Sequence, residues 1–259
     1  MQFHKYQGTG NDFVLIDNRS GELQLTAEQI EQICHRRFGI GADGLMLLNE
    51  HAGYDFEMKY FNADGRPGSL CGNGSRCIIR FAYDIGIQKN MYCFLASDGP
   101  HQAELFPNGQ IRIHMNDVEV IQTFGDDLFM NTGSPHVVRF VAGLQELDVY
   151  NTGKSIRYHE QYAPGGTNVN FLERTPDPNR IYVRTYERGV EDETYSCGTG
   201  VTACALALAH SDRVVRETIV DTKGGQLMVQ YKTADFTSFQ EICLTGPATK
   251  VFHGEIDLS

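Results

Sequence analysis

The chain has 259 residues, and 41% of them are hydrophobic, which is enough for one large or two medium domains with a packed core. It carries 22 basic and 33 acidic residues, so its formal net charge is −11, and this balance argues against nucleic acid as a partner. The first residues lack a basic segment followed by an apolar one, and no stretch approaches the roughly 20 apolar residues of a membrane helix. We therefore expect a cytoplasmic protein without a membrane partner.

The cysteine pattern predicts free thiols in a reducing compartment. The number of cysteines is odd and no close C-x-x-C pair is present, which disfavours both a disulfide framework and a zinc site, so we expect no metal. The seven cysteines are Cys34, Cys71, Cys77, Cys93, Cys197, Cys204 and Cys243.

The first part of the chain is rich in strand patterns. Thr26 and Gln29 form a capping box that predicts the start of one helix, and a second helix is expected over 74–85, ending before Gly86. Residues 107–110 (Pro-Asn-Gly-Gln) predict a hairpin. Strands are expected at 3–6, 14–17, 45–48, 54–61, 91–96, 102–106 and 111–115.

From about Asp117 the same alternation begins again, with one convincing helix at 201–210. Strands are expected at 118–123, 136–141, 169–172, 181–186, 218–221, 227–231 and 242–244. The chain therefore reads as a tandem repeat of one fold, with domains at 1–116 and 117–246. The C-terminal segment 247–259 can return as a strand to the first domain. The predicted class is α/β of the α+β type, each domain being a strand-rich sheet wrapped around a central helix.

One motif occurs in both halves, as Cys71-Gly72-Asn73-Gly74 and Cys197-Gly198-Thr199-Gly200, and each copy leads into one of the two expected central helices. A thiol before a helix N-terminus faces unpaired backbone N–H groups and the positive end of the helix dipole, which favours the thiolate and lowers the pKa of the thiol. The same N–H groups bind a carboxylate. Two such ends that face each other could hold one amino acid between an acid and a base and invert its stereocentre.

Several further motifs accompany this pair. They are Phe3-X-Lys5, Gly8-X-Gly10-Asn11-Asp12-Phe13, residues 61–65 (Phe-Asn-Ala-Asp-Gly), Arg76-Cys77 after the first cysteine motif, and Tyr186-Glu187-Arg188-Gly189. With these motifs the chain resembles the diaminopimelate epimerases. They occur in family order and cover nearly the whole chain. The resemblance implies a cofactor-independent isomerase of two similar domains, which interconverts LL- and meso-diaminopimelate in lysine and peptidoglycan synthesis.

The resemblance also implies roles for individual residues. Cys71 and Cys197 match the two acid/base residues, assisted by His136 and Glu187 respectively. Backbone groups of Gly72, Asn73, Gly198 and Thr199 match the positions that hold the reacting carboxylate. Asn11 and Glu187 match positions near the reacting amino group, and Asn62, Asn168 and Arg188 match those that grip the distal end.

Three positions depart from the family pattern. Gly44 stands where many members have Gln, Ser134 where many have Asn, and Thr199 where many have Ser. Thr199 keeps a backbone amide and a hydroxyl. Gly44 and Ser134 lack side-chain amides, which bears on distal recognition more than on the chemistry.

Three other readings stay open from the residues. The first is another racemase of the same fold, such as a proline racemase, which a side-by-side assay of diaminopimelate and proline distinguishes. The second is a thiol–disulfide switch, and the third is an amino-acid-binding protein without catalysis. The oligomeric state also stays open, with a homodimer as one option.

Overall fold

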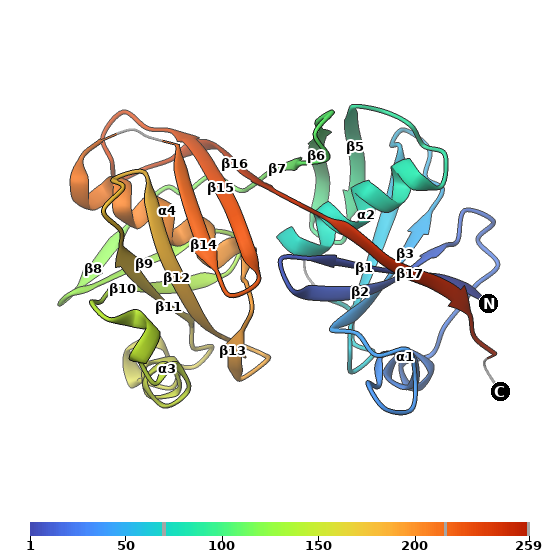
Figure 1. Ribbon diagram of the computed structural model, residues 1–259, viewed down its shortest axis with the longest axis horizontal. Helices are drawn as coiled ribbons and strands as arrows, with labels where there is room; N and C mark the ends of the chain where they lie inside the picture. Colours follow the sequence, from blue (N-terminus) through green and yellow to red (C-terminus); the bar gives the residue numbers. More distant parts are fainter. Residues whose placement is uncertain (69–70, 215–216, 258–259) are drawn as a thin grey trace. The chain divides into compact units, whose positions relative to one another are not determined.

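The computed structural model describes residues 1–68, 71–214 and 217–257 (Figure 1). It divides into two compact units. Unit 1 comprises Met1–Ile113 and Gly246–Ser259, and unit 2 comprises His114–Thr245.

In unit 1 the helix α2 (Gly72–Asp84) packs against strands from several parts of one sheet, including β1, β2, β3, β6 and β17. The strands follow the order β17-β1-β2-β3-β4-β5-β6-β7, with parallel pairing only for β2/β3 and β4/β5 among these neighbours. The other elements are β1 (Gln2–Gly8), β2 (Asn11–Asp17), α1 (Ala27–Cys34), β3 (Gly44–Asn49), β4 (Phe56–Asn62), β5 (Met91–Ala96), β6 (Gly99–Leu105), β7 (Ile111–His114, whose last residue begins unit 2) and β17 (Thr249–Glu255).

In unit 2 the helix α4 (Gly198–Asp212) packs in the same way against β9, β10, β11, β12, β14 and β15. The strand order is β8-β9-β10-β11-β12-β14-β15-β16, again with two parallel pairs, β10/β11 and β12/β14. The other elements are β8 (Gln122–Phe124), β9 (Asp127–Asn131), β10 (Pro135–Phe140), the 3₁₀ turns η1 (Leu144–Glu146) and η2 (Glu160–Tyr162), α3 (Val149–Arg157), β11 (Asn168–Arg174), β12 (Arg180–Glu187), β13 (Asp192–Thr194), β14 (Thr218–Thr222), β15 (Gly225–Lys232) and β16 (Gln240–Gly246).

The two units repeat one topology. Read from β17 in unit 1 and from β8 in unit 2, the sequence of antiparallel and parallel pairings is the same. Along the chain, one helix (α1 or α3) connects the two strands of the first parallel pair in each unit. The central helix (α2 or α4) lies between the two strands of the second parallel pair. The α+β class with a helix inside each sheet is confirmed.

The central helices are buried because the sheets surround them. Nearly every residue of α4 from Val201 to Ala209 is buried, so this helix is apolar on all sides. In α2 the burial covers Cys77, Ile78 and Phe81, while Arg80 and Asp84 form an exposed ion pair one turn apart.

Two sequence expectations for unit 2 are wrong. A single helix was expected, but α3 lies between β10 and β11, as α1 lies between β2 and β3. Its segment contains Asn, Thr and Gly, which form helices poorly; the Asp148 side chain caps it, and Gly153 lies so close to Tyr186 that a Cβ there would approach the Tyr186 Cβ to 2.4 Å. The strand expected at 118–123 is instead an isolated bridge at Val118 followed by the short strand β8.

The local signals in unit 1 are confirmed. The Thr26 side chain accepts a hydrogen bond from the Gln29 backbone N–H, and the Gln29 side chain accepts one from the Thr26 N–H. The hairpin at 107–110 joins the antiparallel strands β6 and β7, with Gly109 in the left-handed region at φ 82°.

Because Thr26 satisfies an N–H group that the helix leaves unpaired, we expect Thr26→Ala to lower the free energy of unfolding by about 1 kcal/mol. Urea unfolding followed by circular dichroism measures the change. Thr26→Ser keeps the accepting oxygen and should lie close to the wild type. Equal stability of the Ala and Ser variants would contradict a role for the cap.

Candidate active site

Cys71 and Cys197 occupy the same position in their units, the N-cap of the central helix. Their backbone angles agree closely, with φ −112° and ψ 117° for Cys71 and φ −116° and ψ 114° for Cys197. The first N–H groups of each helix have no acceptor within the helix. Both thiols therefore lie next to several hydrogen-bond donors of the backbone. Each unit thus provides a thiol beside a helix end of the kind that can bind an anion.

The Cys71 thiol has two polar neighbours in unit 1. Its sulfur accepts a hydrogen bond from the Gly74 N–H at 3.5 Å and donates to Asn11 Oδ1 at 3.6 Å. Asn73 Nδ2 donates to the same Asn11 oxygen at 3.5 Å. These bonds place Asn11 against the cysteine motif, on the strand β2.

An ionic network holds Asn11 in place. Asn11 Nδ2 donates to Asp43, and Arg36 bridges Asp43 and Asp12 with contacts of 2.7 Å to each. Lys5 pairs with Asp12 at 2.8 Å. Burial opposes the charge on Asp12, but hydrogen bonds from Arg36 and Lys5 outweigh it and lower the pKa of Asp12 to about 2.

Arg76 places a buried cation behind Cys71. Its guanidinium donates to the carbonyl of Gly72 at 3.2 Å, to Asn73 Oδ1 at 2.8 Å, to Thr9 Oγ1 at 3.1 Å and to the carbonyl of Pro247 at 3.1 Å. All four acceptors are neutral. Burial lowers the pKa of Arg76 to about 10, so the group stays charged at neutral pH and favours negative charge on Cys71.

Cys197 has a different polar neighbour in unit 2. Its sulfur lies 3.4 Å from Thr199 Oγ1, and Thr199 Oγ1 lies 2.8 Å from His136 Nε2. A hydroxyl that accepts from the imidazole can give its own hydrogen to the sulfur. His136 is therefore connected to Cys197 through one hydroxyl group.

Asn170 determines which nitrogen of His136 carries the hydrogen. Its Nδ2 group donates to the Val137 carbonyl at 2.9 Å and contacts His136 Nδ1 at 3.1 Å, and its Oδ1 accepts from Thr185 at 2.9 Å. With Nδ1 as acceptor, the neutral imidazole carries its hydrogen on Nε2, toward Thr199. A Cβ on Gly200 would lie 2.2 Å from Asn170 Oδ1, so the glycine of the motif makes room for this amide.

His136 is held in the neutral form. Burial, with a smaller effect of the Arg188 charge, lowers the pKa of His136 to about 3. The side chain is fully buried. It acts as a hydrogen-bond donor at neutral pH rather than as a cation.

The residues expected at the distal end divide into two groups. The Asn168 amide is used inside unit 2: Nδ2 donates to Ser134 Oγ at 2.6 Å and to the Pro135 carbonyl at 2.9 Å, and Oδ1 accepts from the Arg188 N–H at 2.9 Å. By contrast, the Arg188 side chain has no carboxylate partner within the described part of the chain. Glu187 is half-buried at the end of β12, as Asn62 ends β4 in unit 1.

Three other cysteines are unsuited to acid–base chemistry. Burial raises the pKa of Cys34 to about 12 and also raises the pKa values of Cys77 and Cys204. Such thiols stay protonated at neutral pH. Cys93 is exposed and Cys243 is half-buried.

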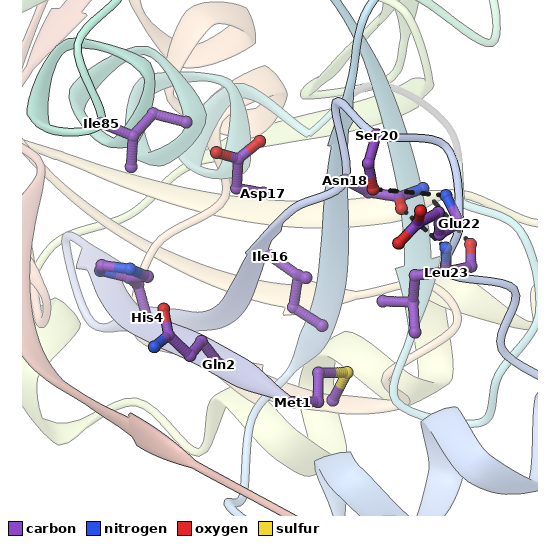
Figure 2. A pocket seen from close by; sticks show the side chains of 10 residues that line it. All are labelled: Met1, Gln2, His4, Ile16, Asp17, Asn18, Ser20, Glu22, Leu23 and Ile85. Atoms are coloured by element: carbon purple, nitrogen blue, oxygen red, sulfur yellow. Dashed lines mark hydrogen bonds between the residues drawn. The ribbon is translucent and has the colours of Figure 1, made fainter.

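Unit 1 also contains a pocket of about 530 Å³ that is separate from the cysteine motif (Figure 2). None of the expected site residues lines it; Figure 2 labels Met1, Gln2, His4, Ile16, Asp17, Asn18, Ser20, Glu22, Leu23 and Ile85. In the described ranges no group of His, Cys, Asp and Glu side chains is arranged to hold a metal ion. No helix among those residues is long and apolar enough to cross a membrane.

Sequence reasoning gave no role to Arg76 or Asn170. A weak signal existed for both: Arg76 directly precedes the apolar residues 77–79 of its helix, and Asn170 lies between Val169 and Phe171 in the strand β11. Thr199 was expected to hold substrate, but its contacts also join His136 to Cys197.

Solved structures define the class to which this fold belongs. The chain matches a phenazine biosynthesis protein of the PhzF family from Bacillus anthracis with a TM-score of 0.79 at 15% identity, covering 100% of this chain and 99% of that one. It matches a probable proline racemase from Agrobacterium radiobacter with a TM-score of 0.70 at 14% identity, covering 100% and 93%. These likenesses establish a shared two-unit fold.

Sequence comparison gives the family. The family model described as diaminopimelate epimerase matches residues 3–121 and 128–251. A diaminopimelate epimerase from Flavobacterium psychrophilum is 45% identical over 99% of this chain and 100% of its own length, and one from Chlorobaculum tepidum is 44% identical over 97% and 99%. The chain belongs to the diaminopimelate epimerase family.

The lowered pKa of His136 predicts a pH dependence of stability. The unfolded chain binds a proton near pH 6.5 that the folded protein takes up only near pH 3, so the free energy of unfolding should decrease as the pH falls through this range, by up to about 1.4 kcal/mol per pH unit. Urea unfolding between pH 7.5 and 4.5 measures this slope. His136→Gln should flatten it, whereas His159→Gln, at an exposed position of the same unit, should not. The same slope in all three proteins would contradict the burial of a neutral imidazole.

The contact of Thr199 with Cys197 predicts a hydroxyl effect on thiol reactivity. Thr199→Val keeps the shape and loses the donor, so alkylation of Cys197 by iodoacetamide at pH 7 should slow about fivefold. Thr199→Ser should keep the wild-type rate. Peptide-resolved mass spectrometry separates Cys197 from the other cysteines. Equal rates in the Val and Ser variants would exclude the hydroxyl as a donor.

Proposed function

We propose that this chain is a cofactor-independent isomerase that interconverts LL- and meso-diaminopimelate through Cys71 and Cys197. The observation that carries the proposal is the occurrence of both thiols at equivalent helix N-caps with nearly identical backbone angles. Membership of the family and identity of up to 45% to enzymes of this name support the substrate.

The chemistry requires a base on one face of the α-carbon and an acid on the other. The α-hydrogen of an amino acid is a very weak acid, and general acid–base catalysis contributes only about 10²–10⁴-fold. The remaining stabilisation has to come from positioned donors. We assign this role to the backbone N–H groups of Gly72, Asn73, Gly198 and Thr199, which would bind the reacting carboxylate as negative charge builds on it.

Each thiol has its own means of carrying negative charge. The buried Arg76 cation and the Gly74 N–H support a thiolate at Cys71. At Cys197 the Thr199 hydroxyl, oriented by neutral His136, plays this part. Besides this contact with Thr199, the assistance of Cys71 by His136 and of Cys197 by Glu187 that the family pattern implies remains part of the proposal. Asn11 and Glu187 would contact the reacting amino group.

The distal end of the substrate has to be recognised in one configuration. A guanidinium and amides in fixed geometry suit a carboxylate, and Arg188 and Asn62 provide them. We propose that Asn168 also contacts the distal end, and that its side chain gives up one of its present hydrogen bonds when the substrate binds. The partner is thus a small molecule, and the enzyme works in the cytoplasm without nucleic acid or membrane.

Incubation of pure protein with LL-diaminopimelate, followed by chiral chromatography, tests the activity directly. Formation of the meso isomer without added cofactor is expected. No conversion, or equal conversion of proline, would contradict the proposed substrate.

Replacing either Cys71 or Cys197 with Ala should reduce isomerisation at least about a hundredfold, because each removes one of the two proton-transferring groups. Cys93→Ser and Cys243→Ser are matched controls, one in each unit, and should keep normal activity. Normal turnover in either alanine variant would exclude the two-thiol mechanism.

A further inference from the structure

The ring of Tyr60 in β4 lies between two glycines of unit 1. A Cβ added to Gly44 would lie 2.6 Å from Tyr60 Cε2, and one added to Gly68 would lie 2.3 Å from Tyr60 Cε1. Gly44 begins β3, next to β4, and Gly68 donates its N–H to the Tyr60 carbonyl at 2.9 Å. The large aromatic side chain fills the volume that the missing side chains of these two glycines leave.

A third contact limits the ring further. Tyr60 packs edge-on against Phe13, with ring centroids 6.0 Å apart and an interplanar angle of 77°. Phe13 is fully buried on β2. The ring is therefore in close contact on both its Cε1 and Cε2 sides and with Phe13, which limits its movement.

The held hydroxyl meets one of the expected distal-end residues. Tyr60 Oη donates to Asn62 Oδ1 at 3.1 Å. Because an amide is planar and its oxygen accepts from Tyr60, the Nδ2 group of Asn62 points away from the phenol with both hydrogens. Within residues 1–68, 71–214 and 217–257 no other hydrogen bond of this side chain is recorded. An exposed amide with its donors directed outward suits a carboxylate.

We propose that Tyr60 is the positioning residue that fixes the Asn62 amide for the distal carboxylate of the substrate, in place of the side-chain amide that this chain lacks at Gly44. The inference rests on the proposed function, since it assumes that Asn62 contacts the distal end. A glutamine at position 44 could not coexist with this arrangement, because its Cβ would collide with the Tyr60 ring and with the Phe61 carbonyl oxygen at 2.5 Å. Gly44, Gly68 and Tyr60 thus act together in the recognition of the distal end of the substrate.

Tyr60→Phe separates positioning from packing, because it keeps the ring between the glycines and removes only the hydroxyl. We expect KM for LL-diaminopimelate to rise about fivefold, with kcat within about twofold of the wild type. The matched control is Tyr92→Phe, which removes a hydroxyl that donates to the Ile87 carbonyl at 2.7 Å in the same unit. It should change neither parameter. An unchanged KM in Tyr60→Phe, or a loss confined to kcat, would overturn the proposal.

A binding measurement separates this inference from the proposed function. Calorimetric titration of both proteins with meso-diaminopimelate should give about fivefold weaker binding for Tyr60→Phe. If the wild type binds without isomerising and Tyr60→Phe binds more weakly, the proposed activity fails and the role of Tyr60 stands. If both proteins bind equally, the role of Tyr60 fails whatever the activity. If the wild type neither binds nor converts the ligand, both proposals fail.

Discussion

The placement of a thiol at the N-cap of a buried helix is the constraint on which the rest of the structure depends. A helix surrounded by a sheet leaves only its ends open, and the unpaired N–H groups of its first turn have to find acceptors. Cysteine followed by glycine meets this condition in both units, because glycine places no side chain over the N–H groups and the sulfur caps the helix or lies beside its first turn. Within its own unit, each sheet brings the start of one strand to its motif: β2 brings Asn11 to Cys71, and β10 brings His136 to Thr199.

The repeat gives the two thiols the same backbone conformation but different side-chain environments. The second glycine of each motif packs against the equivalent strand residue: a Cβ on Gly74 would meet Met46 at 2.0 Å, and one on Gly200 would meet Asn170 at 2.2 Å. Unit 1 therefore has an apolar contact where unit 2 has an amide that orients His136. Unit 1 has instead the buried guanidinium of Arg76, where the corresponding helix position in unit 2 is Thr202, bonded to the Gly198 carbonyl. In the proposed mechanism the two thiols exchange the roles of acid and base, and they need not be supported by the same groups.

Much of the fold and the centre of the candidate site could be predicted from the sequence. The capping box at Thr26, the hairpin at 107–110 and the two motif helices are local signals, and the structure confirms them. The helix α3 has a local cap in Asp148, but its Asn, Thr and Gly residues form helices poorly, and the packing of Gly153 on the distant Tyr186 is not visible in the sequence. The position of Tyr60 between Gly44 and Gly68 depends on strand register, which composition and periodicity do not reveal.

The central claim is that two different groups move the proton, one on each face of the α-carbon. Conversion of LL-diaminopimelate in heavy water, stopped early, tests this most directly by the position of the isotope. If one thiol removes the hydrogen and the other delivers a solvent-derived deuteron, the meso product carries deuterium at the inverted carbon while the remaining LL substrate carries none. Product that retains the original hydrogen, or deuterium that enters substrate and product equally fast, would contradict the account.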